Sequence, residues 1–288
     1  MDKKPLLAVI GGSGLYSMAG LENVREYDLD TPFGKPSAPI VAGELAGESV
    51  TFLARHGFGH HISPSEINYR ANIYALKMLG VERIVSISAC GSLRDDYAPG
   101  DIVIPNQIFD FTRGRERTFF GHGLVAHLGA ADPYCPDLSE QLYGAVQLTG
   151  TRLHQGGTLI VIEGPRFSTK AESNTFRGWG MSIIGMTACP EAFLAREAEM
   201  CYATMAHVTD YDVWHTSEEP VSVEAVIAVL NRNTQIAQQA IANLAKIIKP
   251  DRPCDCPTAL ANAIITNPAV IPPETRQQLD LFVGKYLK

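Results

Sequence analysis

The stretch IVSISACGS, residues 84–92, decides the fold class of this chain. It begins with a run of mostly apolar, β-branched residues, which is typical of a buried strand. It ends in small residues, where a ligand can approach the backbone closely, although a simple turn is the alternative interpretation. Similar apolar runs predict strands at residues 6–10, 50–53, 102–104, 158–162, 183–185 and 201–208.

Stretches with helical patterns lie between these predicted strands. Ser63-Pro64-Ser65-Glu66 places a capping Ser before a Pro at the first helical position and a Glu at the third, which predicts a helix from here to Gly80. Thr169 and Glu172 have the same capping spacing and predict the start of another helix. The alternation of strands and helices predicts an α/β layer architecture.

The longest helical pattern begins at Ser222, and its apolar residues recur at helical spacing as far as residue 248. No internal repeat or low-complexity linker precedes residue 249, so we expect one domain over residues 1–248. Residues 249–288 are expected to form an extension packed on that domain. Within it, Pro272-Pro273-Glu274 predicts the start of a short amphipathic helix.

Composition excludes several classes of protein. The chain has 288 residues, of which 45% are hydrophobic and 19% charged, so it is neither disordered nor collagen-like. Its net charge of -7 argues against a long nucleic acid as partner. No apolar run reaches the roughly 18 residues that a membrane span needs, so we expect no membrane partner and a cytoplasmic location.

The six cysteines are too sparse and scattered for a disulfide-built scaffold. No CxxC pair and no HExxH motif offers zinc ligands, so the sequence predicts no metal site. Cys254 and Cys256 are the one close pair. We interpret them as two thiols of the extension rather than as a strained disulfide, and whether they ever form one stays open.

Loops rich in glycine and donors follow the first two of the predicted strands. The loop IGGSGL, residues 10–15, exposes backbone N–H groups and one hydroxyl, which suits an anion about as well as it suits a tight turn. The loop RHGFGHH, residues 55–61, gathers an Arg and three His, which favours a phosphate over a metal. A solvated basic loop is the alternative for this second motif.

Two later loops carry an aromatic ring and a pair of acids. In EGPRFS, residues 163–168, Phe167 can cover a flat heterocycle, although a core Phe is the alternative. In TDYDVW, residues 209–214, two carboxylates lie two positions apart, so that one raises the pKa of the other and favours proton transfer. Surface carboxylates are the alternative. All these loops leave the carboxyl ends of predicted strands, the edge at which open α/β sheets bind ligands.

Together with other motifs, these loops resemble the trimeric purine nucleoside phosphorylase family, and within it the members that act on S-methyl-5′-thioadenosine. The resemblance covers about residues 6–248 and is carried by residues 10–15, 31–37, 55–57, 68–72, 89–93, 163–167 and 209–212. It implies an α/β fold of a single domain, with a central mixed, partly barrel-like sheet flanked by helices. It also implies a homotrimer or a dimer of trimers.

The implied activity is phosphorolysis of S-methyl-5′-thioadenosine to adenine and 5-methylthioribose 1-phosphate. Inorganic phosphate is then a co-substrate, and neither a metal nor an organic cofactor is expected. The enzymatic alternatives are a purine nucleoside phosphorylase of broad or 6-oxopurine specificity and a methylthioinosine phosphorylase. A nucleoside-binding module without catalysis is the alternative of a different class.

The resemblance also assigns expected roles to individual residues. The phosphate-binding positions are Ser13, Arg55, His56, Ser88, Ala89 and Thr187. The positions that contact the nucleoside are Cys90, Gly91, Phe167, Met186, Asp210, Asp212, Val223 and Val226, with His127 reaching in from a neighbouring subunit. Ser168 and Val223 are expected to tune specificity.

Asp210 is expected to be the catalytic acid at the purine N7, with Asp212 beside it. A 6-oxopurine enzyme of this family typically has Asn at the position of Asp210, because an amide can donate a hydrogen bond to O6 and an ionised carboxylate cannot. The acidic pair therefore favours a 6-aminopurine.

Overall fold

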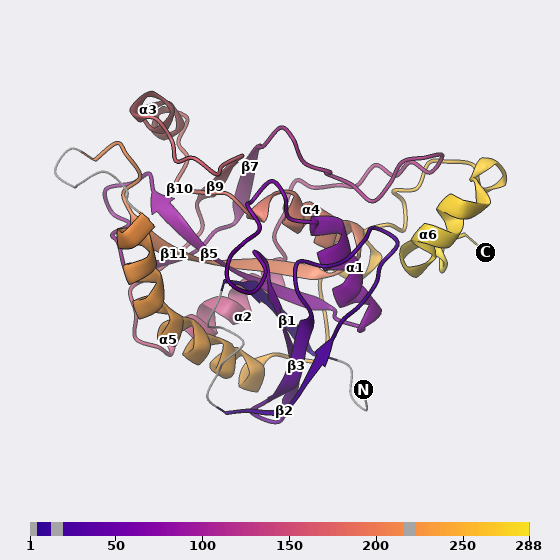
Figure 1. Cartoon of the computed structure of the whole chain (residues 1–288), viewed down its shortest axis with the longest axis horizontal. Helices are drawn as coiled ribbons and strands as arrows, with labels where there is room; N and C mark the ends of the chain where they lie inside the picture. The colour runs from indigo at the N-terminus through magenta and orange to yellow at the C-terminus, as the bar shows by residue number, and fades with distance from the viewer. Residues whose placement is uncertain (1–4, 13–19, 216–222, 288) are drawn as a thin grey trace.

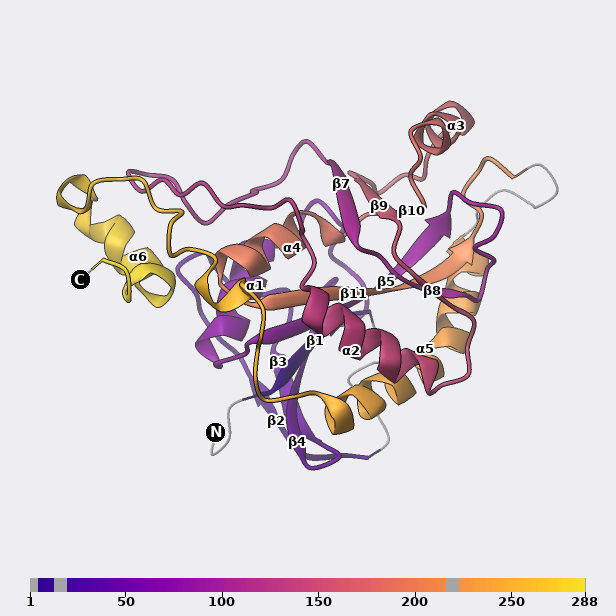
Figure 2. The ribbon, with the colours of Figure 1, turned by 180° about the vertical axis from the view of Figure 1, so that it is seen from behind.

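A computed structural model describes residues 5–12, 20–215 and 223–287, with the side chains of 223–232 left out of the description. One mixed sheet of eleven strands forms the centre of this part of the chain (Figures 1 and 2). Its main path runs through β2 (Leu21–Tyr27), β3 (Ile40–Leu45), β4 (Glu48–Ala54), β1 (Leu7–Gly11), β5 (Arg83–Ser92), β10 (Ile183–Gly185), β9 (Thr158–Ile162) and β7 (Gln107–Phe111). A side branch consists of β11 (Cys201–Asp210), β6 (Ile102–Ile104) and β8 (Leu153–Gln155).

The strand β5 is the branch point of the sheet. Its first half pairs in parallel with β1, and its last residues, Gly91 and Ser92, pair antiparallel with β10. The parallel strand β11 pairs with β5 along its length, from Arg83 to Gly91. The predicted fold class is confirmed. The expected barrel-like character takes the form of a branched sheet that does not close.

Helices cover both faces of the sheet. Helices α1 (Tyr69–Met78) and α4 (Ala188–Glu197) pack on one face, whereas α2 (Pro136–Gln147) and α5 (Val223–Ile247) pack on the other (Figure 2). Alternate residues of β1 face the two sides, with Ala8 and Ile10 toward α1 and Leu7 and Val9 toward α2. This alternation is the period of two of a strand that is buried on both faces. Two further helices are α3 (Lys170–Gly178) and α6 (Pro273–Val283).

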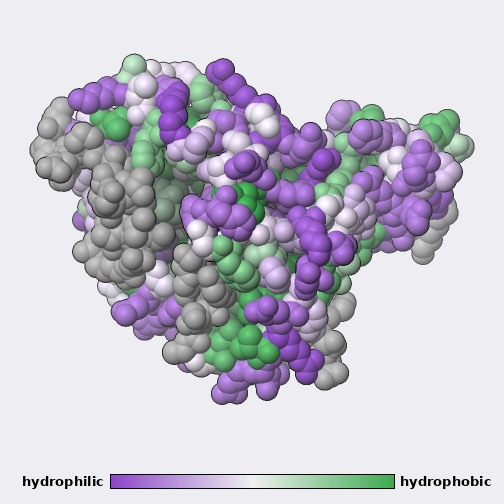
Figure 3. Space-filling view, in the orientation of Figure 1, coloured by the Kyte–Doolittle hydropathy of each residue, from purple (hydrophilic) through white to green (hydrophobic). Residues whose placement is uncertain are grey.

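Every predicted strand is present. The strands that the sequence did not indicate are β2, β3, β7 and β8. Most of β2 is exposed, and its sequence LENVREY contains no apolar run that would have predicted it. Hydrophilic side chains also cover much of the face seen in Figure 3, with scattered apolar patches between them. No helix in the described ranges is long and apolar enough to cross a bilayer.

The predicted helix starts differ in accuracy. The capping box of α3 is confirmed, because the Thr169 hydroxyl accepts from Glu172 N while Glu172 Oε2 accepts from Thr169 N. The prediction of a helix from Ser63 is wrong. Glu66 Oε2 does accept from Ser63 N at 3.1 Å and from Ser63 Oγ at 2.5 Å, but these bonds close a single turn, and α1 begins only at Tyr69.

Tertiary contacts hold this turn apart from the helix. Ser65 Oγ donates to Glu163 Oε1 at 2.6 Å, and the Tyr69 hydroxyl donates to Pro64 O at 2.9 Å. Asn68 is the actual N-cap, with its side chain accepting from Ala71 N. The start predicted at Ser222 lies outside the described residues, and the helix predicted from Pro273 is present as α6.

The chain beyond residue 248 shares the core with the rest of the protein. Phe282 of α6 packs against Tyr74 of α1 and against Phe119, with ring centroids 5.1 and 4.6 Å apart. The segment between β7 and α2 runs out beside this extension (Figures 1 and 2), and Ala126 bridges to Ile264 there. The domain boundary at residue 248 stays a prediction.

Glu197 at the end of α4 makes stability depend on pH. Its side chain accepts from Thr118 Oγ1 at 2.6 Å and from Phe119 N at 2.8 Å. Burial raises its pKa to about 7 from the ordinary 4.5. Between those two values the folded state holds a proton that the unfolded chain has lost, so stability falls as pH rises through this window.

We therefore predict that the melting temperature of the Glu197→Gln variant, relative to that of the wild type, increases as pH rises from about 4.5 to about 7. The raised pKa corresponds to at most about 3 kcal/mol over this range. Thermal melts at several pH values check this, with the exposed Glu26→Gln as control. Equal pH slopes for the wild type and Glu197→Gln would contradict it.

Candidate active site

A cavity of about 540 Å³ lies where the ends of β4, β5, β9, β10 and β11 meet the helix α5. It brings together most of the residues singled out from the sequence. Those that line it are Arg55, His56, Ser88, Ala89, Cys90, Gly91, Phe167, Ser168, Met186, Thr187, Asp210 and Asp212. Their roles there stay predictions, but their convergence on one cavity is a finding.

Three groups of predicted residues fall elsewhere. Ser13 lies outside the described residues, as do the side chains of Val223 and Val226. His127 is exposed and does not line the cavity of its own chain. Its backbone N–H donates to Ala263 O at 2.8 Å, which fixes it beside the C-terminal extension.

Arg55 is buried at the floor of the cavity, where it is paired with an acid. Its Nε and Nη2 donate to the two carboxylate oxygens of Glu191 at 2.7 and 2.9 Å. Nη2 also donates to Ser86 Oγ at 2.6 Å, and Nη1 donates to Ile87 O at 3.2 Å. The Glu191 carboxylate holds the pKa of Arg55 above its ordinary value against the effect of burial. Since a guanidinium has five N–H donors, one on Nη1 is left for a ligand.

His56 is neutral at the cavity wall. Its Nδ1 lies 2.9 Å from Ile62 O, so Nδ1 carries the proton and donates to that carbonyl. Burial and the neighbouring Arg55 charge lower the pKa of His56 to about 4. The His60 ring stacks on it, with centroids 4.2 Å apart. His56 therefore offers an Nε2 acceptor to the cavity rather than a positive charge.

Hydroxyl groups from two elements meet beside Arg55. Ser88 Oγ of β5 and Thr187 Oγ1, at the N-terminus of α4, lie 3.2 Å apart and are both buried. Ser88 lies within β5, and Thr187 makes no side-chain hydrogen bond to cap α4, so neither hydroxyl is used in a helix cap. Both hydroxyls can turn toward an oxyanion, as the sequence predicts for a phosphate site.

The two acids of the last loop lie together at the end of β11. Asp210 Oδ1 accepts from Asp212 N at 2.7 Å, and Asp210 Oδ2 accepts from Thr209 Oγ1 at 2.6 Å. Burial raises the pKa of both carboxyls, and the Asp210 charge raises that of Asp212 further. In the described part of the protein, the buried Asp212 Oδ2 makes no hydrogen bond of regular geometry, although the buried hydroxyls of Ser168 and Ser173 interact with this carboxyl and oppose the rise of its pKa. This carboxyl still has acceptor positions for a donor from a ligand.

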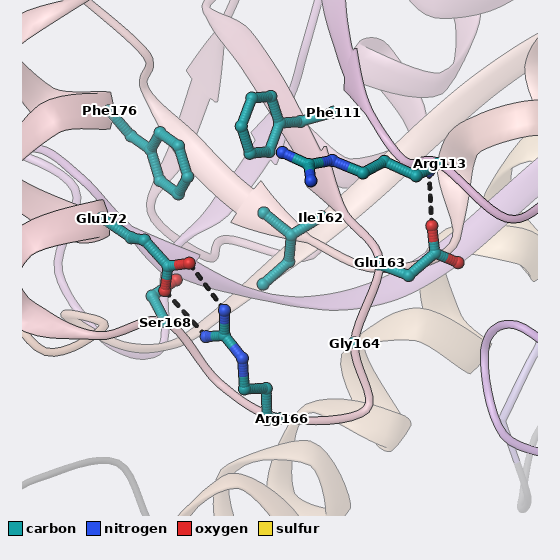
Figure 4. A pocket seen from close by; sticks show the side chains of 9 residues that line it. All are labelled: Phe111, Arg113, Ile162, Glu163, Gly164, Arg166, Ser168, Glu172 and Phe176. Carbon is teal, nitrogen blue, oxygen red and sulfur yellow. Dashed lines mark hydrogen bonds and ion pairs between the residues drawn. The ribbon is translucent and has the colours of Figure 1, made fainter.

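The loop after β9 borders both this cavity and a smaller one of about 250 Å³, whose lining residues are shown in Figure 4. Arg166 reaches across this loop to Glu172 with two bonds of 2.7 and 2.6 Å. Arg166 Nη1 also donates to Phe167 O at 3.0 Å, which holds Phe167 at the rim of the larger cavity.

A buried arginine that the sequence did not indicate fixes the base of this loop. Arg115 Nη2 donates to Glu163 O at 2.7 Å, and its Nη1 donates to Met186 O at 2.7 Å. Its Nε donates to the Glu163 carboxylate at 3.1 Å. Arg115 thereby ties the loop after β9 to the segment that carries Met186 and Thr187.

Two more polar side chains of the cavity were missed. Neither ring nitrogen of His207 nor Nδ2 of Asn233 has a partner in the described ranges, and both residues are buried. Burial lowers the pKa of His207 to about 4, so the ring is neutral. A histidine within the apolar strand 201–208 was the available signal. Glu191, missed as well, is the one acid at the start of α4.

Comparison with known proteins decides the family. A model of the phosphorylase superfamily matches residues 6–248. The chain belongs to this superfamily. The resemblance stated from the sequence motifs is therefore confirmed, and the match begins and ends within a residue or two of the predicted strands and helices that carry those motifs.

Curated relatives match this chain over nearly its whole length. The S-methyl-5′-thioadenosine phosphorylase of Geobacter sulfurreducens is 54% identical over 283 residues, which cover 98% of this chain and 99% of the relative. That of Thermofilum pendens is 50% identical over 263 residues, 91% of this chain and 100% of the relative.

Solved structures agree with these sequence matches. A methylthioadenosine phosphorylase from an antarctic soil metagenomic library superposes with a TM-score of 0.93 at 47% identity, covering 97% of this chain and 99% of that one. The Schistosoma mansoni methylthioadenosine phosphorylase in complex with adenine has a TM-score of 0.81 at 38% identity, covering 85% and 92%.

The absence of a side chain at Gly91 makes room for the acidic pair of this superfamily member. A Cβ there would lie 2.8 Å from Asp210 Oδ1 and 3.3 Å from Asp212 Cβ. We predict that Gly91→Ala displaces both acids and lowers kcat/KM about 10- to 100-fold, since a misplacement of about 1 Å at a reacting group can cost about 10²-fold. Steady-state rates check this. Gly144→Ala in α2 meets nothing within 4 Å and is the control. Equal losses in the two variants would refute the prediction.

Proposed function

We propose that this chain catalyses the phosphorolysis of S-methyl-5′-thioadenosine to adenine and 5-methylthioribose 1-phosphate. The observation that carries the proposal is the buried pair Asp210 and Asp212, which are joined by a hydrogen bond and both line the cavity. The names of the relatives, which match at about 50% identity, support the same reaction.

The acidic pair suits a 6-aminopurine. Asp212 Oδ2 accepts a hydrogen bond from the exocyclic amino group, which a 6-oxopurine lacks. Burial raises the pKa of Asp210 and so favours a protonated carboxyl, while Thr209 Oγ1 and Asp212 N oppose that shift by donating to it. A carboxyl balanced in this way delivers its proton to N7 as the base leaves.

On the other side of the cavity, we assign the phosphate to the donors around Arg55. The free Nη1 proton of Arg55, the hydroxyls of Ser88 and Thr187, and the backbone at Ala89 surround this position, and Ser13 is proposed as a further donor. Neutral His56 accepts a hydrogen bond at Nε2 from the O–H of a hydrogen phosphate, because its Nδ1–H already donates to Ile62 O.

The reaction then proceeds with one bond broken and one formed. The C1′–N9 bond breaks with its electron pair going to the purine, and Asp210 protonates N7 to make adenine a neutral leaving group. The negative phosphate stabilises the oxocarbenium-like ribosyl group and then forms the O–C1′ bond. Neither a catalytic metal nor an organic cofactor takes part in these steps.

The remaining contacts to the nucleoside follow from the same proposal. Cys90, Gly91, Phe167 and Met186 surround the sugar and base, and Ser168 tunes base specificity from beside Asp212. Val223 and Val226 receive the methylthio group.

We propose a homotrimer, or a dimer of trimers, in which the partner subunit's His127 closes the 5′ end of the cavity. The exposure of His127 on its own chain supports this arrangement. We also propose a cytoplasmic location, with small molecules rather than nucleic acid or membranes as partners.

The proposal predicts adenine release from S-methyl-5′-thioadenosine that depends on phosphate. Asp210→Asn removes the proton donor and should lower this rate about 10²- to 10⁴-fold. A spectrophotometric assay of adenine with and without phosphate measures both effects. Asp137→Asn, which does not line the cavity, should keep the wild-type rate. Release that is equally fast without phosphate would point to a hydrolase, and binding without any turnover to a nucleoside-binding module.

Asp212→Asn tests the choice of base. Its amide has an N–H donor that can serve O6 of a 6-oxopurine, and one fewer acceptor for the 6-amino group. We predict that the ratio of kcat/KM for methylthioadenosine to that for methylthioinosine falls by about 10- to 100-fold, the value of one or two discriminating hydrogen bonds. An unchanged ratio would remove Asp212 from base recognition. A wild-type preference for inosine or methylthioinosine would overturn the substrate proposal itself.

A further inference from the structure

Four cysteine thiols from three distant parts of the chain meet at one point. Cys135 is the N-cap of α2, Cys201 is the first residue of β11, and Cys254 and Cys256 belong to the extension after α5. Their four sulfur atoms all lie within 4.8 Å of one another. The sulfurs of Cys201 and Cys254 are 3.5 Å apart, so a close contact joins the extension to β11.

The surroundings of the cluster suit thiolates held for a structural purpose. Cys135, Cys201 and Cys256 are at most 3% exposed and belong to the apolar cluster under α2 and α5. Cys135 Sγ accepts a hydrogen bond from Leu138 N at 3.5 Å, at the positive end of the α2 dipole. Both the backbone donor and the helix terminus stabilise a negative sulfur.

We infer that these four cysteines bind one zinc ion. A tetrahedral site with Zn–S bonds of about 2.3 Å has sulfurs about 3.8 Å apart, so sulfurs within 4.8 Å need to close by no more than about 1 Å. Four thiolates and no open position make a structural site rather than a catalytic one. Each thiol gives up its proton to solvent when the ion binds, and no electron is transferred.

The ion would fasten the extension to the domain at the point where it leaves α5. Arg83 already holds this point, since its Nη2 donates to the carbonyls of Lys249, Pro250 and Asp251 at 2.8, 2.8 and 2.9 Å. Farther along, the extension pairs with the segment that carries His127. A site at the root of the extension would therefore stabilise the whole length of chain that supports that segment.

The first test is the metal content of the untagged protein, purified under reducing conditions and dialysed against zinc-free buffer. We expect about one zinc per chain by elemental mass spectrometry. The Cys254→Ser/Cys256→Ser double variant should hold at least ten-fold less zinc and melt at a lower temperature. Cys189→Ala, which removes a buried thiol outside the cluster, should keep the zinc and is the matched control.

A second measurement keeps the inference testable if the double variant does not fold. Wild-type protein stripped of metal and reconstituted with Co²⁺ should show the intense visible bands of a tetrahedral thiolate complex. Titration with a thiol reagent in the presence of a metal-sensitive dye should release the zinc in step with modification of the cluster. Wild-type protein purified without metal overturns the inference. This holds whether thiol counting in denaturant finds all six cysteines free or the intact mass shows that disulfides have formed.

Discussion

The buried ion pair between Arg55 and Glu191 is the interaction on which the site depends. Arg55 stands at the end of β4, and its guanidinium also bonds to Ser86 of β5 and to Ile10 O of β1. Glu191 comes from α4 and also accepts from the Tyr202 hydroxyl of β11 at 2.8 Å. Five elements therefore meet at one charge pair. Removing either partner leaves a buried charge uncompensated, which costs about 3–5 kcal/mol, so this corner of the sheet has little freedom to rearrange.

This pair changes how anion binding at the site is explained. The sequence suggests local positive charge from Arg55 and His56, but Glu191 balances the first and burial keeps the second neutral. In the proposed phosphate site, the anion is held by oriented donors more than by net charge. Such donors are fixed before the ligand arrives. In a low dielectric, a fixed dipole stabilises an anion more strongly than it does in water.

Features of the fold and the site could be predicted from the sequence where the interactions that form them lie between residues close in the chain. The capping box at Thr169 is correct because both of its hydrogen bonds lie within one turn. The start at Ser63 fails although its local bonds form, because Ser65 is held by Glu163, almost a hundred positions away. Arg115 and the four-cysteine cluster were missed for the same reason. Their partners are brought together only by the fold, and no spacing in the sequence records that.

The stretch at residues 84–92 contains more information than its apolar run and small end suggest. In a strand, alternate residues face opposite sides, so Val85 and Ile87 join the core under α5 while Ser86 and Ser88 face the side of α4. The two serines therefore have a role of their own in an otherwise apolar strand. They supply the hydroxyls that bond to Arg55 and approach Thr187. At Gly91, the absent side chain leaves space that Asp210 occupies across the β5–β11 ladder. One strand thus contributes core residues on one face, the hydroxyls of the anion side on the other, and at Gly91 the space for the acids.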